Sequence, residues 1–183
     1  MHLTLSVVGK DKPGIIAAVT KICYRLGGNL EDASMSILND QFAMILSVSF
    51  PSRNQNKLSL FRKQLGQLEK MLSLTITVQE IKGIKKKSKM ESSKLCAYLI
   101  SIFGKDQAGI VYRVSNLLAR YRLNITDLDS KLISGRPKPI YGLLLEVDIP
   151  KRFSVEKLKK DLDGLARSLK VDLTFKPVDP ITL

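Results

Sequence analysis

The sequence has one histidine and two cysteines in 183 residues, and this scarcity limits its chemistry. His2 lies at the very start of the chain, and no pair of carboxylates at motif spacing replaces it as an acid and base. Two cysteines far apart cannot form a zinc site by themselves. Residues 9–11 (GKD) lack the Gly-Lys-Ser/Thr sequence and the earlier glycine of a P-loop. We therefore expect a protein that is not an enzyme, with no metal and no cofactor.

Long apolar runs and a cysteine framework are also missing. No stretch approaches the roughly 18 apolar residues of a membrane span, and residues 1–4 lack the features of a secretory signal. Cys23 falls within the apolar spacing of a predicted helix, so we expect it in a core, whereas Cys96 opens a predicted strand. Cysteines in such places do not indicate disulfides, and we expect a cytoplasmic protein.

The most informative feature that is present is an internal repeat. Residues 9–15 (GKDKPGI) return as residues 104–110 (GKDQAGI), and at the same offset residues 29–32 (NLED) correspond to residues 124–127 (NITD). Each copy of the turn follows a short apolar run and precedes a helical pattern. Such self-similarity indicates that one supersecondary unit was built twice.

The first copy predicts the order strand, helix, strand, strand, helix, strand. Apolar residues recur every three or four positions in residues 15–26 and 58–72, which is the period of a helix with one buried face. Asp11 is expected to cap the first helix, and Pro13 to lie in its first turn. Gly27 and Gly28 are expected to end that helix. The strand-like runs are residues 3–8, 29–38, 41–50 and 74–78, with a tight hairpin at Asn39-Asp40.

The second copy repeats this order, with helical patterns over residues 110–121 and 155–169. Its hairpin, residues 134–139, is longer and rich in proline and basic residues, so we expect an exposed and mobile loop. A βαββαβ unit folds into a four-stranded antiparallel sheet with both helices on one face. The expected fold class is therefore α+β, with two tandem ferredoxin-like units that pair through their sheet edges or faces.

The net charge of +13 is densest between the two copies. Residues 84–94 hold five lysines and one glutamate, and they lack apolar periodicity. We therefore expect a first domain at 1–83, an exposed basic linker at 84–94 and a second domain at 95–183. Contact of this linker with nucleic acid or with an acidic partner stays open as an alternative.

The repeated turn is the candidate ligand site. It leads from a strand into a helix whose first N–H groups have no intrahelical acceptor, and these groups favour a carboxylate. Gly14 has no side chain to keep a ligand from the backbone, and Asp11 could accept a hydrogen bond from an ammonium group. Asn29, at the far end of the helix, supplies a donor and an acceptor. The same residues are also an ordinary helix start, so on their own they leave both interpretations open.

The turn, the helix, the pair Gly28-Asn29 and the hairpin, in this order and twice, resemble the ACT domain, a regulatory module that binds small molecules. The resemblance covers nearly the whole chain, and the tandem arrangement is similar to the glycine cleavage system transcriptional repressor family. In the ACT family, amino acids bind at interfaces between ACT units, near the first strand-to-helix turn.

The resemblance implies a specific set of ligand-binding residues in each copy. In the first copy these are Asp11, Lys12, Pro13, Gly14, Ile15 and Asn29. In the second copy they are Asp106, Gln107, Gly109, Ile110 and Asn124. The second copy departs from the pattern at Ala108, where proline is usual, and at Leu123, which corresponds to Gly28. These departures make the second site less complete.

The resemblance implies a non-enzymatic regulatory protein. It would bind a small amino acid and modulate a protein partner, a transcription regulator in the control of amino-acid (glycine cleavage) metabolism. A homo-oligomer is compatible with this role, and no membrane partner is expected.

Two alternatives stay open beside this hypothesis. One is a direct nucleic-acid-binding protein that uses its basic surface, and the other is a regulatory subunit that acts in trans on a metabolic enzyme. The predicted third strands, in residues 41–48 and 140–147, lack the Lys/Arg-Gly-Phe motif of RNA-recognition modules, and no helix-turn-helix is evident. Both observations argue against direct, specific nucleic-acid binding.

Overall fold

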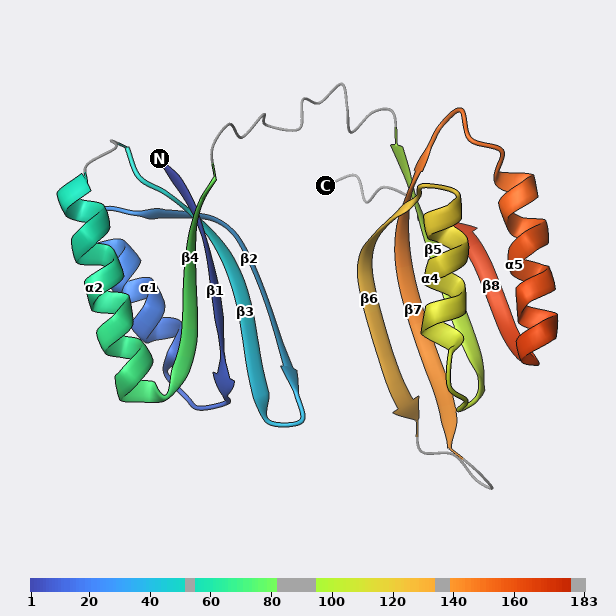
Figure 1. The fold of residues 1–183 in the computed structure, drawn as a ribbon, viewed down its shortest axis with the longest axis horizontal. Coiled ribbons are helices and arrows are strands. Elements are labelled where there is room, and N and C mark those ends of the chain that lie inside the picture. Colours follow the sequence, from blue (N-terminus) through green and yellow to red (C-terminus); the bar gives the residue numbers. More distant parts are fainter. Residues whose placement is uncertain (52–54, 82–94, 134–138, 179–183) are drawn as a thin grey trace. The chain divides into compact units, whose positions relative to one another are not determined.

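A computed structural model describes residues 1–51, 55–81, 95–133 and 139–178 (Figure 1). The chain divides into two compact units, unit 1 (Met1–Lys86) and unit 2 (Lys87–Leu183). Each unit has the order βαββαβ, which confirms the expected fold class. The whole predicted linker, residues 84–94, and residues 134–138 of the long hairpin lie outside the described residues, and the expectations about them stay predictions.

Unit 1 is a four-stranded antiparallel sheet with two helices on one face (Figure 1). The strand order is β2-β3-β1-β4, so the first strand lies in the middle of the sheet and β2 forms an edge. Its elements are β1 (His2–Lys10), α1 (Ile15–Arg25), β2 (Asn29–Leu38), β3 (Gln41–Ser49), α2 (Gln55–Leu72) and β4 (Leu74–Ile81).

The core of unit 1 follows the two periods that the sequence predicts. Alternate residues of the central strands face the helices, and every third or fourth residue of the helices faces the sheet. Cys23 lies in this core with no exposed surface, as predicted. The fully buried residues include Leu3, Leu5, Val7, Val19, Leu46, Phe61 and Leu65.

The start of α1 differs from the prediction. The helix begins at Ile15, and its N-cap is Gly14 at φ 95°, with no side-chain cap bond. Asp11 and Pro13 precede the helix, so Asp11 does not cap it and Pro13 is not in its first turn. The chain leaves β1 and enters α1 through a left-handed residue, a conformation that glycine adopts without steric cost. The turn geometry therefore puts the cap position at the glycine.

The end of α1 and the first hairpin agree with the prediction. Gly27 is left-handed at φ 73°, and the Gly28 N–H donates to the Cys23 carbonyl at 2.8 Å, which ends the helix. Asn39 and Asp40 are both left-handed, at φ 48° and 60°. Two such residues between paired strands form the tight turn that suits the sheet twist.

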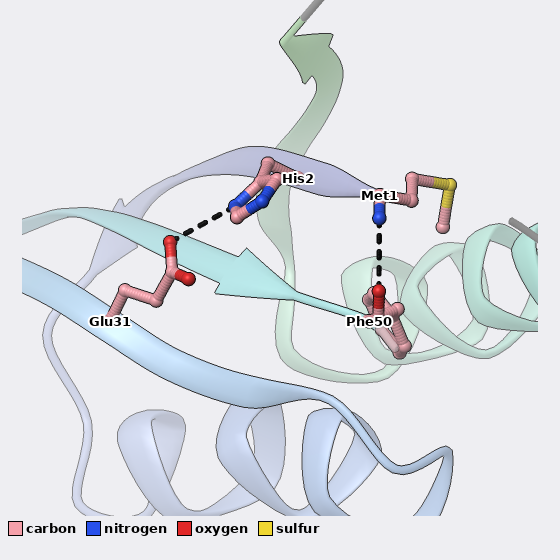
Figure 2. Close-up of polar contacts among 4 residues, drawn as sticks. All are labelled: Met1, His2, Glu31 and Phe50. Carbon is pink, nitrogen blue, oxygen red and sulfur yellow. Dashed lines mark hydrogen bonds and ion pairs between the residues drawn. The ribbon is translucent and has the colours of Figure 1, made fainter. Parts of the chain in front are cut away.

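Polar contacts hold the chain start against β2 and β3 (Figure 2). The Met1 amino group donates to the Phe50 carbonyl at 2.9 Å, and the Phe50 N–H donates to the Met1 carbonyl at 2.8 Å. The strand register shifts between Leu30 and Asp32, and Glu31 at this bulge reaches across to His2, with Oε2 and Nδ1 3.1 Å apart. His2, the sole histidine of the sequence, thus has a structural contact in the sheet.

Unit 2 repeats the architecture, with the strand order β6-β7-β5-β8. Its helices share one face of the sheet and enclose a second apolar core. Across the described residues, none of the helices has the length and apolar character that a bilayer crossing requires. The elements are β5 (Leu95–Lys105), α4 (Ile110–Arg120), β6 (Asn124–Ile133), β7 (Ile140–Pro150), α5 (Val155–Leu169) and β8 (Val171–Pro177).

The two cores differ at one pair of neighbouring positions, where unit 1 has a glycine beside a large side chain and unit 2 has two side chains of medium size. A Cβ on Gly28 would lie 2.8 Å from Val48 Cγ1 and 2.9 Å from Phe50 Cζ, so the phenylalanine ring takes the space beside this glycine. The strand registers place Leu123 and Ile149 at the corresponding positions of unit 2, and both are buried. The difference between Gly28 and Leu123 is therefore a packing difference between the units.

We expect the two cysteines to differ strongly in reactivity. Burial raises the pKa of the Cys23 thiol to about 11, from an ordinary value of 9.0, which makes its thiolate about 100-fold rarer. Cys96 is only half-buried. A thiol reagent at neutral pH should therefore modify Cys96 quickly in the native protein and Cys23 only after unfolding. Equal rates for both thiols in the folded protein would contradict this expectation, and a Cys96→Ala variant identifies the fast site.

The same pKa shift has a consequence for stability. The folded-state pKa of Cys23 lies above the unfolded value, so the contribution to stability is complete below pH 9.0 and is lost as the pH rises through about 11. A Cys23→Ala variant should lack this part of the alkaline destabilisation.

Candidate functional site

The first turn of unit 1 borders a groove that the sheet completes. The groove has a volume of about 540 Å³ and lies between the start of α1 and the helix-facing side of β2 and β3. Five of the predicted site residues line it, which are Asp11, Lys12, Pro13, Gly14 and Ile15. The other lining residues are Ile16, Ala17, Met35, Ile37 and Phe42. The turn thus contributes polar backbone, and the strands contribute an apolar wall.

The N-terminus of α1 lies open at this groove. The first intrahelical bond runs from the Ala18 N–H to the Gly14 carbonyl at 2.9 Å, and no side chain caps the helix. The N–H groups of Ile15, Ile16 and Ala17 precede that bond and therefore have no acceptor within the helix. Together with the helix dipole, they form an environment that suits an anion.

Gly14 keeps the backbone at the groove accessible. It adopts φ 95°, and a Cβ built on it would meet nothing within 4 Å. No neighbouring side chain therefore explains why this residue lacks one. The left-handed backbone is the conformational reason for glycine at this position, and the missing side chain leaves the backbone open to the groove.

Asp11 combines an anchored backbone with an exposed side chain. Its N–H donates to the Asp40 carbonyl at 2.8 Å, which ties the turn to the tip of the first hairpin. Its carboxylate lines the groove and has no hydrogen-bond or ion-pair partner among the described residues. A cationic group in the groove could therefore use it as an acceptor.

Lys12 has a structural contact that recurs in unit 2. Its ammonium group lies 3.4 Å from the carbonyl of Leu72, the last residue of α2. In unit 2 the side-chain amide of Gln107 donates to the carbonyl of Leu169, the last residue of α5. The residue two places before each glycine N-cap thus fastens the turn to the end of the second helix.

Asn29 is not brought to the groove. It opens β2 at the far end of α1, a helix of 11 residues and thus about 16 Å in length. There it borders a separate depression with Thr20, Lys21 and Tyr24. Asn124 likewise opens β6 beyond the end of α4.

The sequence reasoning missed the apolar wall of the groove. Met35 and Ile37 are 45% and 52% exposed, although the register places them on the helix-facing side of the sheet beside buried Met44 and Phe42. They remain uncovered because β2 is an edge strand. The sequence does contain a signal for this wall, because Met35 and Ile37 alternate with serines in the predicted strand. The sequence does not show, however, that α1 leaves these two side chains uncovered.

The corresponding turn of unit 2 has the same backbone conformation, but the side chains on the neighbouring strand differ. Gly109 is left-handed at φ 92°, it precedes Ile110 at the start of α4, and no side chain caps that helix. Asp106 is exposed before the turn. The position of Met35 is taken by Ser130, so the wall loses an apolar side chain. Among the described residues of both units, no three His, Cys, Asp or Glu side chains gather as a metal would require.

Comparisons with known proteins agree with this architecture. The family model of the ACT domain matches residues 1–79 and 97–176. The chain is similar to a UPF0237 protein of Corynebacterium diphtheriae, at 37% identity over 79 residues, which are 43% of this chain and 88% of the relative. A UPF0237 protein of Methanococcus maripaludis is 35% identical over 78 residues, 43% of this chain and 86% of the relative.

Two solved structures are similar over nearly the full length. An unknown protein from Galdieria sulphuraria has a TM-score of 0.79 at 20% identity, with 97% of this chain and 98% of that chain covered. A protein proposed to be a glycine cleavage system transcriptional repressor has a TM-score of 0.70 at 16% identity, with 97% of both chains covered. At these identities the likeness shows a shared fold. Because the family model covers most of both units, the chain belongs to the ACT domain family and carries the domain twice in tandem.

Proposed function

We propose that this protein is a non-enzymatic regulator that binds a small amino acid at the first turn of unit 1 and thereby changes its contacts with a protein partner. The observation that supports this most directly is the groove in which the open start of α1, Asp11 and an apolar wall come together. Membership of the ACT domain family supports a regulatory role.

An α-amino acid matches the groove in three respects. Its carboxylate would accept hydrogen bonds from the first N–H groups of α1, where the helix dipole favours negative charge. Its ammonium group would donate to the Asp11 carboxylate. Its side chain would lie against Met35 and Ile37, which favours a small apolar group. The volume of about 540 Å³ falls within the range of small-molecule sites.

The contacts of the turn offer a route from ligand to partner. The turn is bonded to the first hairpin through the Asp11 N–H and to the end of α2 through Lys12. A ligand that stabilises one conformation of the turn would therefore favour one arrangement of these neighbours. The partner in this proposal is a transcription regulator that controls amino-acid (glycine cleavage) metabolism. The full-length likeness in fold to a protein proposed to be such a repressor supports that part.

A thermal-shift screen of the full chain against the common amino acids tests the proposal. A ligand at 100 times its dissociation constant should stabilise the unit that binds it by about 2.7 kcal/mol, which corresponds to a melting shift on the order of 10 °C. The amine and the carboxylic acid that match the best amino acid serve as controls and should give much smaller shifts. If no amino acid shifts the melting of the wild type, the proposed ligand class is wrong.

A further inference from the structure

The helices of unit 2 enclose a groove with two pairs of cations. Arg113 and Arg120 of α4, and Lys160 and Arg167 of α5, line this groove, which has a volume of about 660 Å³. On each helix the two cations are seven positions apart, or about 10.5 Å along the axis. The groove is therefore flanked by two rows of positive charge with the same spacing.

The contacts between the helices set which cations lie at each end. Arg113 donates to the hydroxyl of Ser168 at 2.9 Å, so this end of the groove also carries Arg167. At the other end the Tyr121 hydroxyl donates to the Asp161 carboxylate. Tyr121 follows Arg120 in the chain and Asp161 follows Lys160, so this end carries Arg120 and Lys160. One pair of cations thus lies at each end.

The lining of the groove carries little negative charge to compensate these cations. Asp161 is the one carboxylate among the described residues that line the groove, and it already accepts the Tyr121 hydrogen bond, which raises the pKa of that tyrosine. None of the four cations forms an ion pair within the part of the chain that the structure describes. Their side chains are exposed, so their donors are available to a partner.

The floor of the groove is apolar and accessible. Leu117 and Leu165 are half-buried there, packed against the core of unit 2. Gly164 lies beside them, and a Cβ on it would meet nothing within 4 Å. A partner could therefore touch the leucines without displacing a side chain.

Unit 1 shows that the fold does not impose this arrangement. Its helices enclose a groove of about 580 Å³ in the same place. Its lining cations, Lys21 and Arg25, both lie on α1, and Ala18 occupies the position of Arg113. Lys63 and Lys70 of α2 occupy the positions of Lys160 and Arg167, but neither of them lines this groove. A groove lined by cations from both of its helices is thus found in unit 2 and not in unit 1.

We propose that the groove between α4 and α5 is the docking surface for an acidic, amphipathic helix of a partner protein. Carboxylates seven residues apart on such a helix are about 10.5 Å apart, which matches the cation spacing along α4 and α5. Guanidinium groups bind carboxylates with two hydrogen bonds, and the apolar face of the helix covers Leu117 and Leu165. Nucleic acid fits less well, because its rigid phosphate rows offer nothing to the apolar floor. This inference rests on the proposed regulatory role in one respect, which is that the partner is a protein.

A synthetic peptide probe tests this inference with the full-length protein. The probe is a fluorescein-labelled amphipathic helix with glutamates seven residues apart and leucines on one face. Its controls are a scrambled peptide of the same composition and a duplex DNA. Fluorescence anisotropy at low salt should show binding of the probe that is about tenfold tighter than that of the scrambled peptide and that weakens as salt rises.

Matched variants locate the binding surface. Lys160→Glu/Arg167→Glu on α5 should weaken probe binding at least about tenfold. Lys63→Glu/Lys70→Glu on α2 makes the same change of charge at the corresponding positions of unit 1 and should leave binding nearly unchanged. Gly164→Phe fills the groove without removing a charge and should also block the probe, whereas Gly66→Phe on α2 should not. Gly66, like Gly164, has open space in front of it.

The outcomes separate this inference from the proposed function. Equal binding of probe and scrambled peptide, equal losses in the α5 and α2 variants, or tighter binding of DNA than of the probe would each overturn the inference. All four variants leave the first turn of unit 1 intact, so amino-acid binding in the thermal-shift screen is measured independently. If the α5 variants no longer bind the probe but still bind the amino acid, the docking surface lies on unit 2.

Discussion

Replacing Gly14 by leucine is expected to abolish amino-acid binding at the first turn of unit 1. The leucine side chain would extend into the groove in front of the α1 N-terminus, where a Cβ now meets nothing within 4 Å. Loss of two charge-assisted hydrogen bonds, at about 1.5 kcal/mol each, corresponds to roughly 100-fold weaker binding. Isothermal titration calorimetry with the best amino acid from the screen measures this loss.

Backbone strain needs a matched control, because leucine at φ 95° costs about 1–3 kcal/mol of stability. Gly109 has nearly the same φ, 92°, and the same open space, so Gly109→Leu introduces equal strain in unit 2. We expect Gly109→Leu to leave the binding affinity of unit 1 unchanged. A folded Gly14→Leu protein that binds with wild-type affinity would place the site elsewhere.

A second variant tests the same groove without backbone strain. Ile37 is half exposed on β2, so Ile37→Glu should fold normally while its carboxylate repels the carboxylate of the ligand. Leu132 occupies the corresponding place on β6 and is exposed to a similar degree. Leu132→Glu is therefore the matched control, and binding that weakens equally in both variants would contradict a site at the first turn of unit 1.

Gly28→Leu is expected to destabilise unit 1 by about 1–3 kcal/mol, because a side chain at this position overlaps Val48 and the Phe50 ring. Phe50→Ile in the same chain should recover much of this loss, since unit 2 combines Leu123 with Ile149 at the corresponding places. Denaturant unfolding of both single variants and of the double variant measures the coupling.

The reciprocal change in unit 2 provides the control. Leu123→Gly removes a buried side chain and should destabilise unit 2 by about 2–5 kcal/mol. Because each unit has its own apolar core, we expect each variant to shift only the unfolding transition of the unit that carries it. Additive effects of Gly28→Leu and Phe50→Ile would show that the two positions do not share one space.

Local signals in the sequence predicted the elements well. The apolar spacing of residues 58–72 corresponds to α2, and Asn39-Asp40 forms the tight hairpin because both residues tolerate left-handed backbone. The prediction of an Asp11 cap was wrong because the sequence does not show which residue turns the chain from β1 into α1. Gly14 does so through its positive φ.

The sequence by itself determined the duplicated βαββαβ unit, since strand and helix periods and turn residues act over a few positions. It also identified Asp11 and Gly14 as candidates. Only the tertiary structure decided that Met35 and Ile37 join them and that Asn29 lies apart. It also decided that the cations of α4 and α5 form two rows along one groove. The physical reason is that a site joins side chains from different elements, and their meeting depends on strand register and helix contacts, which no local pattern encodes.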